Sequence, residues 1–399
     1  MSNDTRPEIR FPGFTNDWEQ RKLIDLVVRL NKSTNSSRLP KVEFEDIVAG
    51  EGRLNKDVSQ KFDNRKGIEF LPNDILYGKL RPYLKNWLKA TFTGVAIGDF
   101  WVFRAKKSDS DFIYSLIQAD RYQKAANDTS GTKMPRSDWK KVSDTVFYIP
   151  NDLKEQQKIG IFFKKLDDTI ALHQRKLDLL KETKKGFLQK MFPENGAKVP
   201  EIRFPGFTED WEERKLGELG KTQSGIGFPD AEQGGSEGTP FFKVSDMNNI
   251  GNEYEMRNAN HYVSNEQIER KKWKPIKDVP AIIFAKVGAA IMLNRKRLVT
   301  SPFLIDNNTM AYLFNNTWDI YFGKILFETI NLPRYSQVGA LPSYNSSDIE
   351  NISVKVPVKD EQEKIGSFFQ QLDETIALHQ RKLDLLKETK KSFLQKMFV

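Results

Sequence analysis

The sequence predicts an α+β protein in which two pseudo-twofold-related, mixed α/β domains are separated by two long helices that form an antiparallel coiled coil. Three observations support this prediction. A segment of 38 residues occurs twice, a segment of 16 residues also occurs twice, and the regions between them mix short apolar runs with turn residues. Self-similarity of this kind is an architectural signal. At 399 residues the chain is long enough for two or three domains, each with its own core.

The longer repeat predicts the two helices. Residues 155–192 (EQQKIGIFFKKLDDTIALHQRKLDLLKETKKGFLQKMF) and residues 361–398 are identical at 32 of 38 positions. Apolar residues recur in steps of four and three, which is the heptad pattern of a coiled coil. The predicted seam comprises Ile159, Phe163, Leu166, Ile170, His173, Leu177 and Leu180, and in the second copy Ile365, Phe369, Leu372, Ile376, His379, Leu383 and Leu386. The two histidines are expected to fix the register, as polar seam residues often do.

The shorter repeat divides the chain into two halves. Residues 8–23 (EIRFPGFTNDWEQRKL) and residues 201–216 (EIRFPGFTEDWEERKL) are identical at 14 of 16 positions, and we call them the FPGF segments. The predicted layout is a first domain at 1–150, a helix at 151–192, a linker at 193–200, a second domain at 201–357 and a helix at 358–399. If both halves share a fold, the end of the second helix should lie near residues 1–8. The alternative is a coiled coil between two chains.

The two domain interiors share a weaker pattern. Residues 74–80 (DILYGKL) and 281–288 (AIIFAKVG) both predict a short strand that leads into a loop, which places Lys79 opposite Lys286. Each long helix is preceded by a proline and a predicted capping box, formed by Asp152 with Glu155 and by Asp360 with Glu363. The two domains are therefore expected to have one fold and different surfaces.

Composition limits the partners and the compartment. The formal charge of +9 and the pI near 9.2 favour a polyanionic partner. The chain has no cysteine, which excludes disulfides and cysteine metal sites and fits a reducing compartment. No run reaches the roughly 18 apolar residues of a membrane span, so we expect a cytoplasmic protein without a membrane partner.

The sequence contains no recognisable catalytic constellation. It lacks the G-x-x-x-x-G-K-[ST] phosphate loop and the [ND]-P-P-Y segment of amino-methyltransferases. Three histidines are few for a metal or general-base scheme, and we predict neither a catalytic nor a metal site. Glu182-x-Lys184 and Glu388-x-Lys390 have a spacing found in some nucleases, but on a coiled coil we interpret them as solvated helix charges.

A binding surface remains. Basic side chains follow both predicted strands and occur on further loops, where they can neutralise phosphates, and forked arginines can read base edges. The candidate DNA-binding residues are Lys79, Arg81, Lys85, Lys133 and Arg136 in the first half and Lys286, Arg295, Lys296, Arg297 and Tyr344 in the second.

Over essentially its whole length, the chain resembles the specificity subunit of type I restriction-modification enzymes. The resemblance lies in the paired FPGF segments, the DILYGKLRP and AIIFAKVG stretches and the duplicated helices. It implies two target-recognition domains that read the halves of a split duplex DNA site, while the helices set the gap. It also implies a single, non-catalytic specificity chain in a hetero-oligomer with two methyltransferase subunits, which use S-adenosylmethionine to methylate adenine. Restriction and motor subunits would use ATP and magnesium, and this chain would hold no cofactor.

Two other functions fit the same residues. A stand-alone DNA-acting enzyme would cleave or methylate DNA without partners. A coiled-coil scaffold that binds only protein would lack affinity for duplex DNA.

Overall fold

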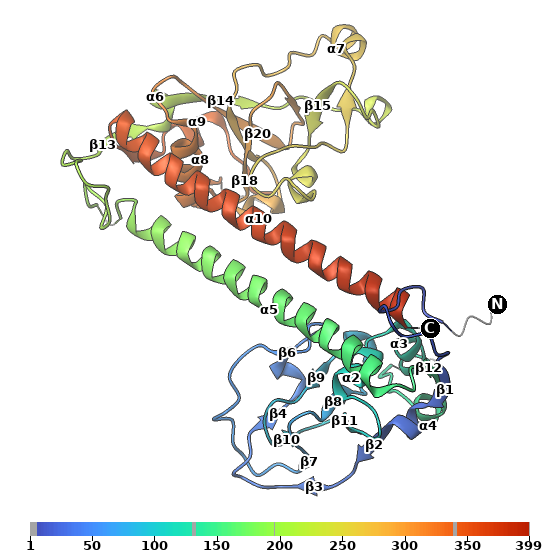
Figure 1. Ribbon diagram of the computed structural model, residues 1–399. Helices are drawn as coiled ribbons and strands as arrows, with labels where there is room; N and C mark the ends of the chain where they lie inside the picture. Colours follow the sequence, from blue (N-terminus) through green and yellow to red (C-terminus); the bar gives the residue numbers. More distant parts are fainter. Residues whose placement is uncertain (1–5, 130–132, 195, 338–340, 399) are drawn as a thin grey trace. The chain divides into compact units, whose positions relative to one another are not determined.

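The chain folds into two compact units. The structure, a computed structural model, describes residues 6–129, 133–194, 196–337 and 341–398. The first unit comprises residues 1–175 and 380–399, and the second unit comprises residues 176–379. Each contains part of α5 (Leu153–Lys190) and part of α10 (Lys359–Met397), which are both continuous helices (Figure 1). The expected mixed α/β class with two long helices is confirmed.

The described part of the first unit contains two four-stranded sheets and two pairs of strands. Its central sheet has the order β2-β11-β8-β9, a second sheet has the order β3-β7-β10-β4, and β1 pairs with β12 and β5 with β6. The strands are β1 (Glu19–Lys22), β2 (Val27–Leu30), β3 (Ser33–Thr34), β4 (Lys41–Val42), β5 (Ile47–Val48), β6 (Arg53–Leu54), β7 (Gly67–Phe70), β8 (Ile75–Gly78), β9 (Trp87–Lys89), β10 (Gly94–Ala96), β11 (Phe100–Ala105) and β12 (Val146–Ile149). The helices besides α5 are α1 (Leu23–Leu26), α2 (Ser110–Leu116), α3 (Asp120–Ala126) and α4 (Trp139–Asp144), with 3₁₀ turns η1 (Phe44–Asp46) and η2 (Pro82–Leu84).

The second unit repeats this plan. Its central sheet has the equivalent order β14-β20-β17-β18, β13 pairs with β21, and a third sheet has the order β16-β15-β19. The strands are β13 (Glu212–Lys215), β14 (Gly220–Ser224), β15 (Thr239–Phe242), β16 (Tyr262–Val263), β17 (Ala281–Ala285), β18 (Lys296–Val299), β19 (Leu304–Ile305), β20 (Thr309–Phe314) and β21 (Ser353–Val356). The helices besides α10 are α6 (Leu216–Leu219), α7 (Asn265–Lys271), α8 (Ile320–Thr329) and α9 (Ser346–Glu350), with 3₁₀ turns η3 (Asp230–Glu232), η4 (Val244–Asn248), η5 (Ala289–Leu293) and η6 (Leu332–Tyr335).

Each central sheet is buried on both faces. Successive side chains of a strand point to opposite faces. In β17, Ile282 and Phe284 therefore join one core cluster, while Ala281 and Ile283 join another. This explains the nearly continuous apolar run AIIFA, which differs from the alternation of a half-exposed strand. Strand β8 divides its side chains between two clusters in the same way.

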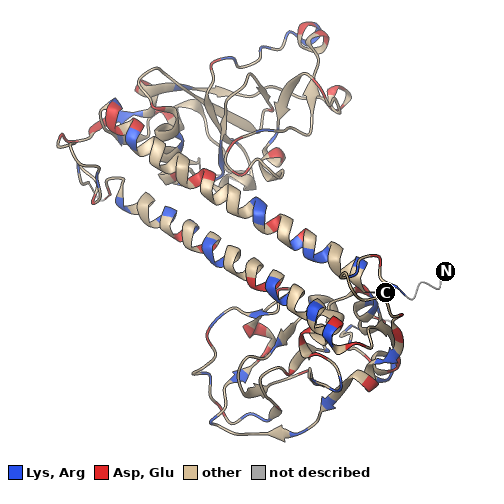
Figure 2. Ribbon diagram, in the orientation of Figure 1, with Lys and Arg blue, Asp and Glu red and all other residues tan. Residues whose placement is uncertain are grey.

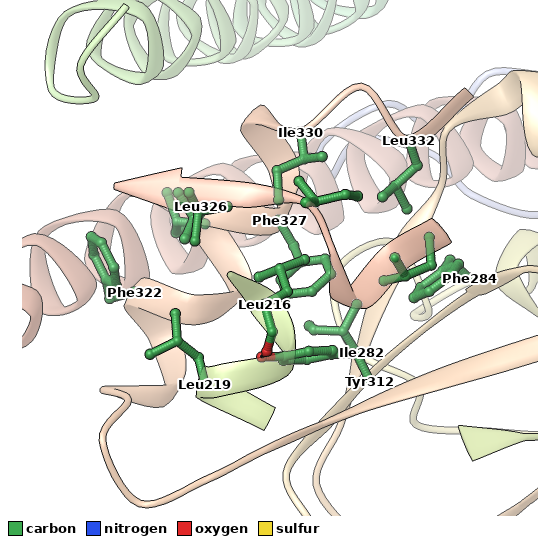
Figure 3. Packing of buried hydrophobic residues seen from close by; sticks show 14 of the residues in the cluster. Leu216, Leu219, Ile282, Phe284, Tyr312, Phe322, Leu326, Phe327, Ile330 and Leu332 are labelled. Atoms are coloured by element: carbon green, nitrogen blue, oxygen red, sulfur yellow. Dashed lines mark hydrogen bonds between the residues drawn. The ribbon is translucent and has the colours of Figure 1, made fainter. Parts of the chain in front are cut away.

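The larger core of the second unit lies between its central sheet and α8. Figure 3 shows Ile282, Phe284 and Tyr312 of the sheet among Phe322, Leu326 and Phe327 of the helix, all in one buried cluster. The Tyr312 hydroxyl donates to the Leu216 carbonyl at 2.8 Å, so its buried polar atom is satisfied.

A buried ion pair ties each long helix to its FPGF segment. Arg10 donates to both carboxylate oxygens of Glu155, at 2.6 and 2.8 Å. Arg203 does the same to Glu361, at 2.7 Å for both bonds. Both carboxylates are at most 1% exposed. Bidentate pairing of this kind is strong and geometrically specific, which explains why these residues recur in both repeats.

A close approach at the start of each helix adds a second contact. A Cβ on Gly160 would lie 2.7 Å from both Asp109 Oδ1 and the Phe112 amide nitrogen. The corresponding atom on Gly366 would lie 2.1 Å from Asp319 Oδ1. Glycine at these two positions therefore allows α2 and α8 to begin directly against α5 and α10, respectively.

The far ends of the helices return to the FPGF segments. The Ile9 amide donates to the Lys396 carbonyl at 3.1 Å, and the Ile202 amide donates to the Lys190 carbonyl at 2.8 Å. Lys396 also pairs with Glu8 at 2.7 Å. The expectation that the second helix ends near the first residues is confirmed at these positions, although residues 1–5 and Val399 lie outside the described part.

The helices pair in antiparallel fashion within each unit. In the first unit, Phe162 contacts Phe393 with ring centroids 5.0 Å apart, and Asp167 pairs with Lys390 at 2.6 Å. In the second unit, the equivalent contacts are Phe187 with Phe368 at 5.0 Å and Lys184 with Asp373 at 2.7 Å. Among the described helices, none is both long and apolar enough to cross a membrane.

The predicted capping boxes are wrong in detail. Asp152 does cap α5, because its side chain accepts from the Lys154 amide at 2.8 Å, but the Glu155 carboxylate binds Arg10. Helix α10 begins at Lys359, so Asp360 lies in its first turn and not at the cap. The tertiary ion pair takes the carboxylate that a local box would have used.

We expect the change Glu155→Ala to destabilise the first unit by about 3 kcal/mol, because it leaves the mostly buried Arg10 guanidinium without its partner. Glu361→Ala should do the same to the second unit. Hydrogen exchange resolved by residue in each variant would measure both effects. The control Glu19→Ala removes an exposed pair with Arg21 and should cost under about 1 kcal/mol. Equal effects of Glu155→Ala and Glu19→Ala would contradict this prediction.

Candidate nucleic-acid interface

In the first unit, two loops converge beyond the end of β8. The Arg81 amide donates to the Pro135 carbonyl at 2.7 Å, and the Ser137 amide donates to the Lys79 carbonyl at 2.8 Å. Leu80 and Arg136 form an isolated antiparallel bridge. These backbone bonds bring together the segments that carry four of the predicted basic residues, Lys79, Arg81, Lys133 and Arg136.

The charges of these two loops are mostly unneutralised. Arg81, Lys85 and Lys133 are exposed, and none of their side chains forms an ion pair with another described residue. Asp99 is the one carboxylate among the described residues that pairs with this group. It lies 3.0 Å from Arg136 Nη2 and 3.5 Å from Lys79 Nζ. An excess of cations on protruding loops suits a phosphate backbone.

Two of these basic residues adopt a strained backbone conformation. Arg81 (φ +49°) and Lys85 (φ +56°) flank the turn η2 in the left-handed region. In the second unit, the turn η5 is flanked by Gly288 (φ +87°) and Asn294 (φ +50°), residues that tolerate positive φ. Left-handed geometry costs an ordinary residue about 1–2 kcal/mol. Retaining Arg and Lys at such sites is typical of functional positions.

The second unit builds the same pair of loops from other side chains. The Gly288 amide donates to the Pro342 carbonyl at 2.8 Å, the Tyr344 amide donates to the Lys286 carbonyl at 3.0 Å, and Val287 bridges Ser343. Gly288 and Ser343 therefore occupy the places of Arg81 and Arg136. Lys286 is half-buried and donates to the Ser224 hydroxyl at 3.0 Å.

Two predicted DNA contacts lie in the core, contrary to the expectation from sequence. Lys296 is 9% exposed and donates to the Ile330 carbonyl at 2.6 Å, and burial lowers the pKa of its ammonium to about 8. Tyr344 is 3% exposed and packs against Phe284. The basic run predicted as a surface loop instead enters β18, where three of the four side chains are buried.

The other two residues of the basic run, Arg295 and Arg297, are partly accessible to solvent. Arg297 is half-buried and donates to the Asn252 carbonyl at 2.6 Å, and burial lowers the pKa of its guanidinium. Arg295 is half-buried and donates to the Asn248 side chain. The second unit thus presents fewer free cations on these loops than the first unit.

The predicted seam residues alternate between two degrees of burial. Buried positions are Ile159, Phe163, Ile170, Leu177, Ile365, Phe369, Ile376 and Leu383, and half-buried positions are Leu166, His173, Leu180, Leu372, His379 and Leu386. The buried seam positions also pack against the domains. For example, Phe163 lies in one core cluster with Phe112 and Phe398. The stripe therefore contacts the domain as well as the opposite helix.

The interpretation of two lysines as solvated helix charges was wrong. Lys184 is buried and pairs with Asp373 and Glu328, at 2.7 and 2.6 Å. The side chain of Lys390 is 13% exposed and pairs with Asp167, and burial raises the pKa of that carboxyl. The acidic partner comes from the other helix in each case, so spacing along one helix does not reveal the pair.

Sequence reasoning also missed an exposed apolar pair on the helices of each unit. The first unit exposes Leu172 of α5 and Leu385 of α10, and the second unit exposes Leu179 and Leu378. Each of these side chains is between 58 and 63% exposed. Figure 2 shows acidic and basic residues at intervals along both helices, with other residues between them.

The described part of the chain offers cations, amides and apolar groups, and its arrangement is suited to binding. Within the described ranges, no group of three or more His, Asp and Glu side chains is placed to hold a metal ion. The converging loops of the first unit are the most basic candidate interface.

Comparison with known proteins relates most of the chain to one family. The family model described as the type I restriction modification DNA specificity domain matches residues 15–182 and 208–388. The type I restriction enzyme MjaVIII specificity subunit of Methanocaldococcus jannaschii is 24% identical over 314 residues, which cover 72% of this chain and 68% of that protein.

Two solved structures share the fold. The S subunit of a type I restriction-modification system from M. genitalium has a TM-score of 0.67 at 15% identity, and the match covers 99% of each chain. A chain from a structure that addresses complex assembly and conformational transition of the type I R-M system has a TM-score of 0.53 at 17% identity. That match covers 94% of this chain and 96% of the other.

We expect Lys296→Met to change stability and its pH dependence without affecting DNA binding. Because the pKa of Lys296 is lowered on folding, the unfolded chain binds more protons between pH 8 and 10.5, and stability should rise with pH in that window. The variant should lack this rise, which is worth up to about 3 kcal/mol. Urea unfolding at pH 7, 9 and 10.5 measures it. The control Lys286→Met should keep the rise, and a rise of the same size in Lys296→Met would refute the assignment.

Proposed function

The chain belongs to the type I restriction modification DNA specificity family, and from this premise we propose that it reads an asymmetric, two-part site in double-stranded DNA. Each half of the site is read by one recognition domain, residues 1–150 or residues 201–357. The helices at 151–192 and 358–399 and the linker at 193–200 connect the two domains. The chain itself supplies recognition, and its partners supply the bond chemistry.

The observation that carries this proposal is that two equivalent loop pairs carry different side chains. The bonds that join Lys79 to Ser137 and Lys286 to Tyr344 are the same backbone bonds. The side chains at equivalent positions differ, with the exposed Arg136 in the first unit and the half-buried Ser343 in the second. Loops that are joined by the same backbone bonds but carry different hydrogen-bonding groups favour different bases. Because the two recognition domains favour different bases, the whole DNA site is asymmetric.

The continuous helices support a fixed gap between the half sites. A helix of 38 residues, such as α5, is roughly 57 Å long, the length of about 17 base pairs. The buried ion pairs at Glu155 and Glu361 hold each helix firmly to its own domain. We therefore assign the helices the role of a spacer.

Partner subunits complete the proposed complex. The exposed leucine pair of each unit offers one apolar docking surface per unit, which fits two methyltransferase subunits. These partners would bind S-adenosylmethionine and methylate adenine, and restriction and motor subunits would use ATP and magnesium. One specificity chain per hetero-oligomer suffices, because both readers lie in the same chain.

Inserting one heptad into each long helix tests the spacer role. Seven residues add about 10.5 Å, so the permitted gap should grow by about 3 base pairs. Sequencing of methylated sites in cells that carry the complex measures the gap. A variant with the same number of conservative substitutions at exposed helix positions is the control. If the heptad variant methylates sites with the original gap, the spacer role is disproved.

Replacing the exposed leucine pair of one unit should remove one methyltransferase subunit. We expect Leu172→Glu with Leu385→Glu to weaken association at the first unit by at least 10-fold, because two charges would replace apolar contacts that the bound subunit buries. Native mass spectrometry of the assembled complex counts the subunits. The control Ile250→Glu alters an exposed residue that belongs to neither long helix and should leave the count unchanged. Retention of both subunits in the leucine variant would rule out this docking surface.

A further inference from the structure

Asp99 holds Arg136 in a defined orientation at the surface of the first unit. Arg136 Nη2 and Nε both point to Asp99 Oδ2, at 3.0 and 3.4 Å. The carboxylate therefore occupies the side edge of the guanidinium. The end edge, which Nη1 and Nη2 form, is left available, and the Arg136 side chain is 53% exposed.

The second unit has no such pairing of an aspartate with an arginine at the equivalent place. The Asp99 carbonyl accepts from the Lys79 amide at 2.9 Å, and the Asn308 carbonyl accepts from the Lys286 amide at 2.7 Å, so Asn308 is the counterpart of Asp99. Ser343 is the counterpart of Arg136, by the matching bridges to Val287 and Leu80. One scaffold thus carries an oriented arginine in one unit and a short hydroxyl in the other.

We propose that Arg136 is a specificity-determining residue that reads a guanine in the half site of the first unit, with Asp99 as its positioning residue. The proposal rests on the proposed function and names one base contact within it. The end edge of a guanidinium matches the O6 and N7 acceptors of guanine in the major groove. A carboxylate on the side edge fixes that fork before DNA arrives, which reduces the entropy lost on binding.

The charges around Arg136 also favour duplex DNA as the ligand. Lys79, Arg81 and Lys133 lie on the same two loops, and the last two are exposed. Their cations suit the phosphates beside the base, and such contacts fix register without reading sequence. A phosphate contact by Arg136 itself is the competing role. It differs in a measurable way, because lysine can replace arginine at a phosphate but cannot form the fork at guanine.

The test uses the intact complex with its methyltransferase subunits and maps methylated sites for the wild type, Arg136→Ala and Arg136→Lys. Competition binding then uses duplexes changed at one base pair at a time. We expect both variants to lose discrimination at one G·C pair in one half site, by about 10- to 100-fold. The other half site should be unchanged. The matched variant Ser343→Ala should leave that G·C preference intact.

Asp99→Asn tests the positioning role. It should relax the same base pair in the wild-type background and add nothing in the Arg136→Ala background, because it acts through the arginine. A purely structural role would lower the melting temperature and add to Arg136→Ala. Equal weakening across all sequences, with a smaller salt dependence that Arg136→Lys restores, would assign Arg136 to a phosphate and overturn the proposal.

The methylation map of the wild-type complex distinguishes failure of the proposed function from failure of the guanine contact. If the wild-type complex methylates no two-part motif, the proposed function is wrong. If it methylates such a motif but no G·C preference depends on Arg136, only the guanine contact is wrong.

Discussion

The buried carboxylate at the start of each long helix is the constraint on which the rest of the structure depends. Glu155 and Glu361 are almost fully removed from water, and a buried charge is tolerated only when it is paired and hydrogen-bonded. Arg10 and Arg203 supply that partner from the FPGF segments. Segment, helix and domain core are therefore held together at one point. The glycines at 160 and 366 add to the same junction, because they allow a neighbouring helix to begin directly against each long helix.

This rigid junction leaves the loops beyond the central sheets free to diverge. Backbone hydrogen bonds that do not depend on side-chain identity join both loop pairs at equivalent places. The first unit carries arginine at two positions where the second unit carries glycine and serine. The reciprocal pairs of Asp167 with Lys390 and of Lys184 with Asp373 add a charge pattern between the helices that suits an antiparallel register. Stable framework and variable surface are separated in space.

The candidate interface was predictable in part. Lysines and arginines that follow the strand at 74–80 could be singled out because the strand is apolar and the loop after it is basic. Lys296 and Tyr344 could not be rejected, because burial depends on which strand a segment joins. Asp99 carried no local signal, since the backbone brings it to Arg136 from 37 residues away. The exposed leucines could not be singled out from the sequence, because they lie in a repeat whose other leucines form the seam.

The sequence by itself determined the duplication, the two long helices, the antiparallel return of the chain and the mixed α/β class, because periodicity and repetition are properties of order along the chain. The tertiary structure alone decided which charges are buried. The pairing of Lys184 with Asp373, the partner of Glu155 and the free edge of Arg136 each depend on residues far apart in sequence. Burial and pairing are set in three dimensions, where the desolvation of a charge must be balanced by a partner that no local pattern specifies.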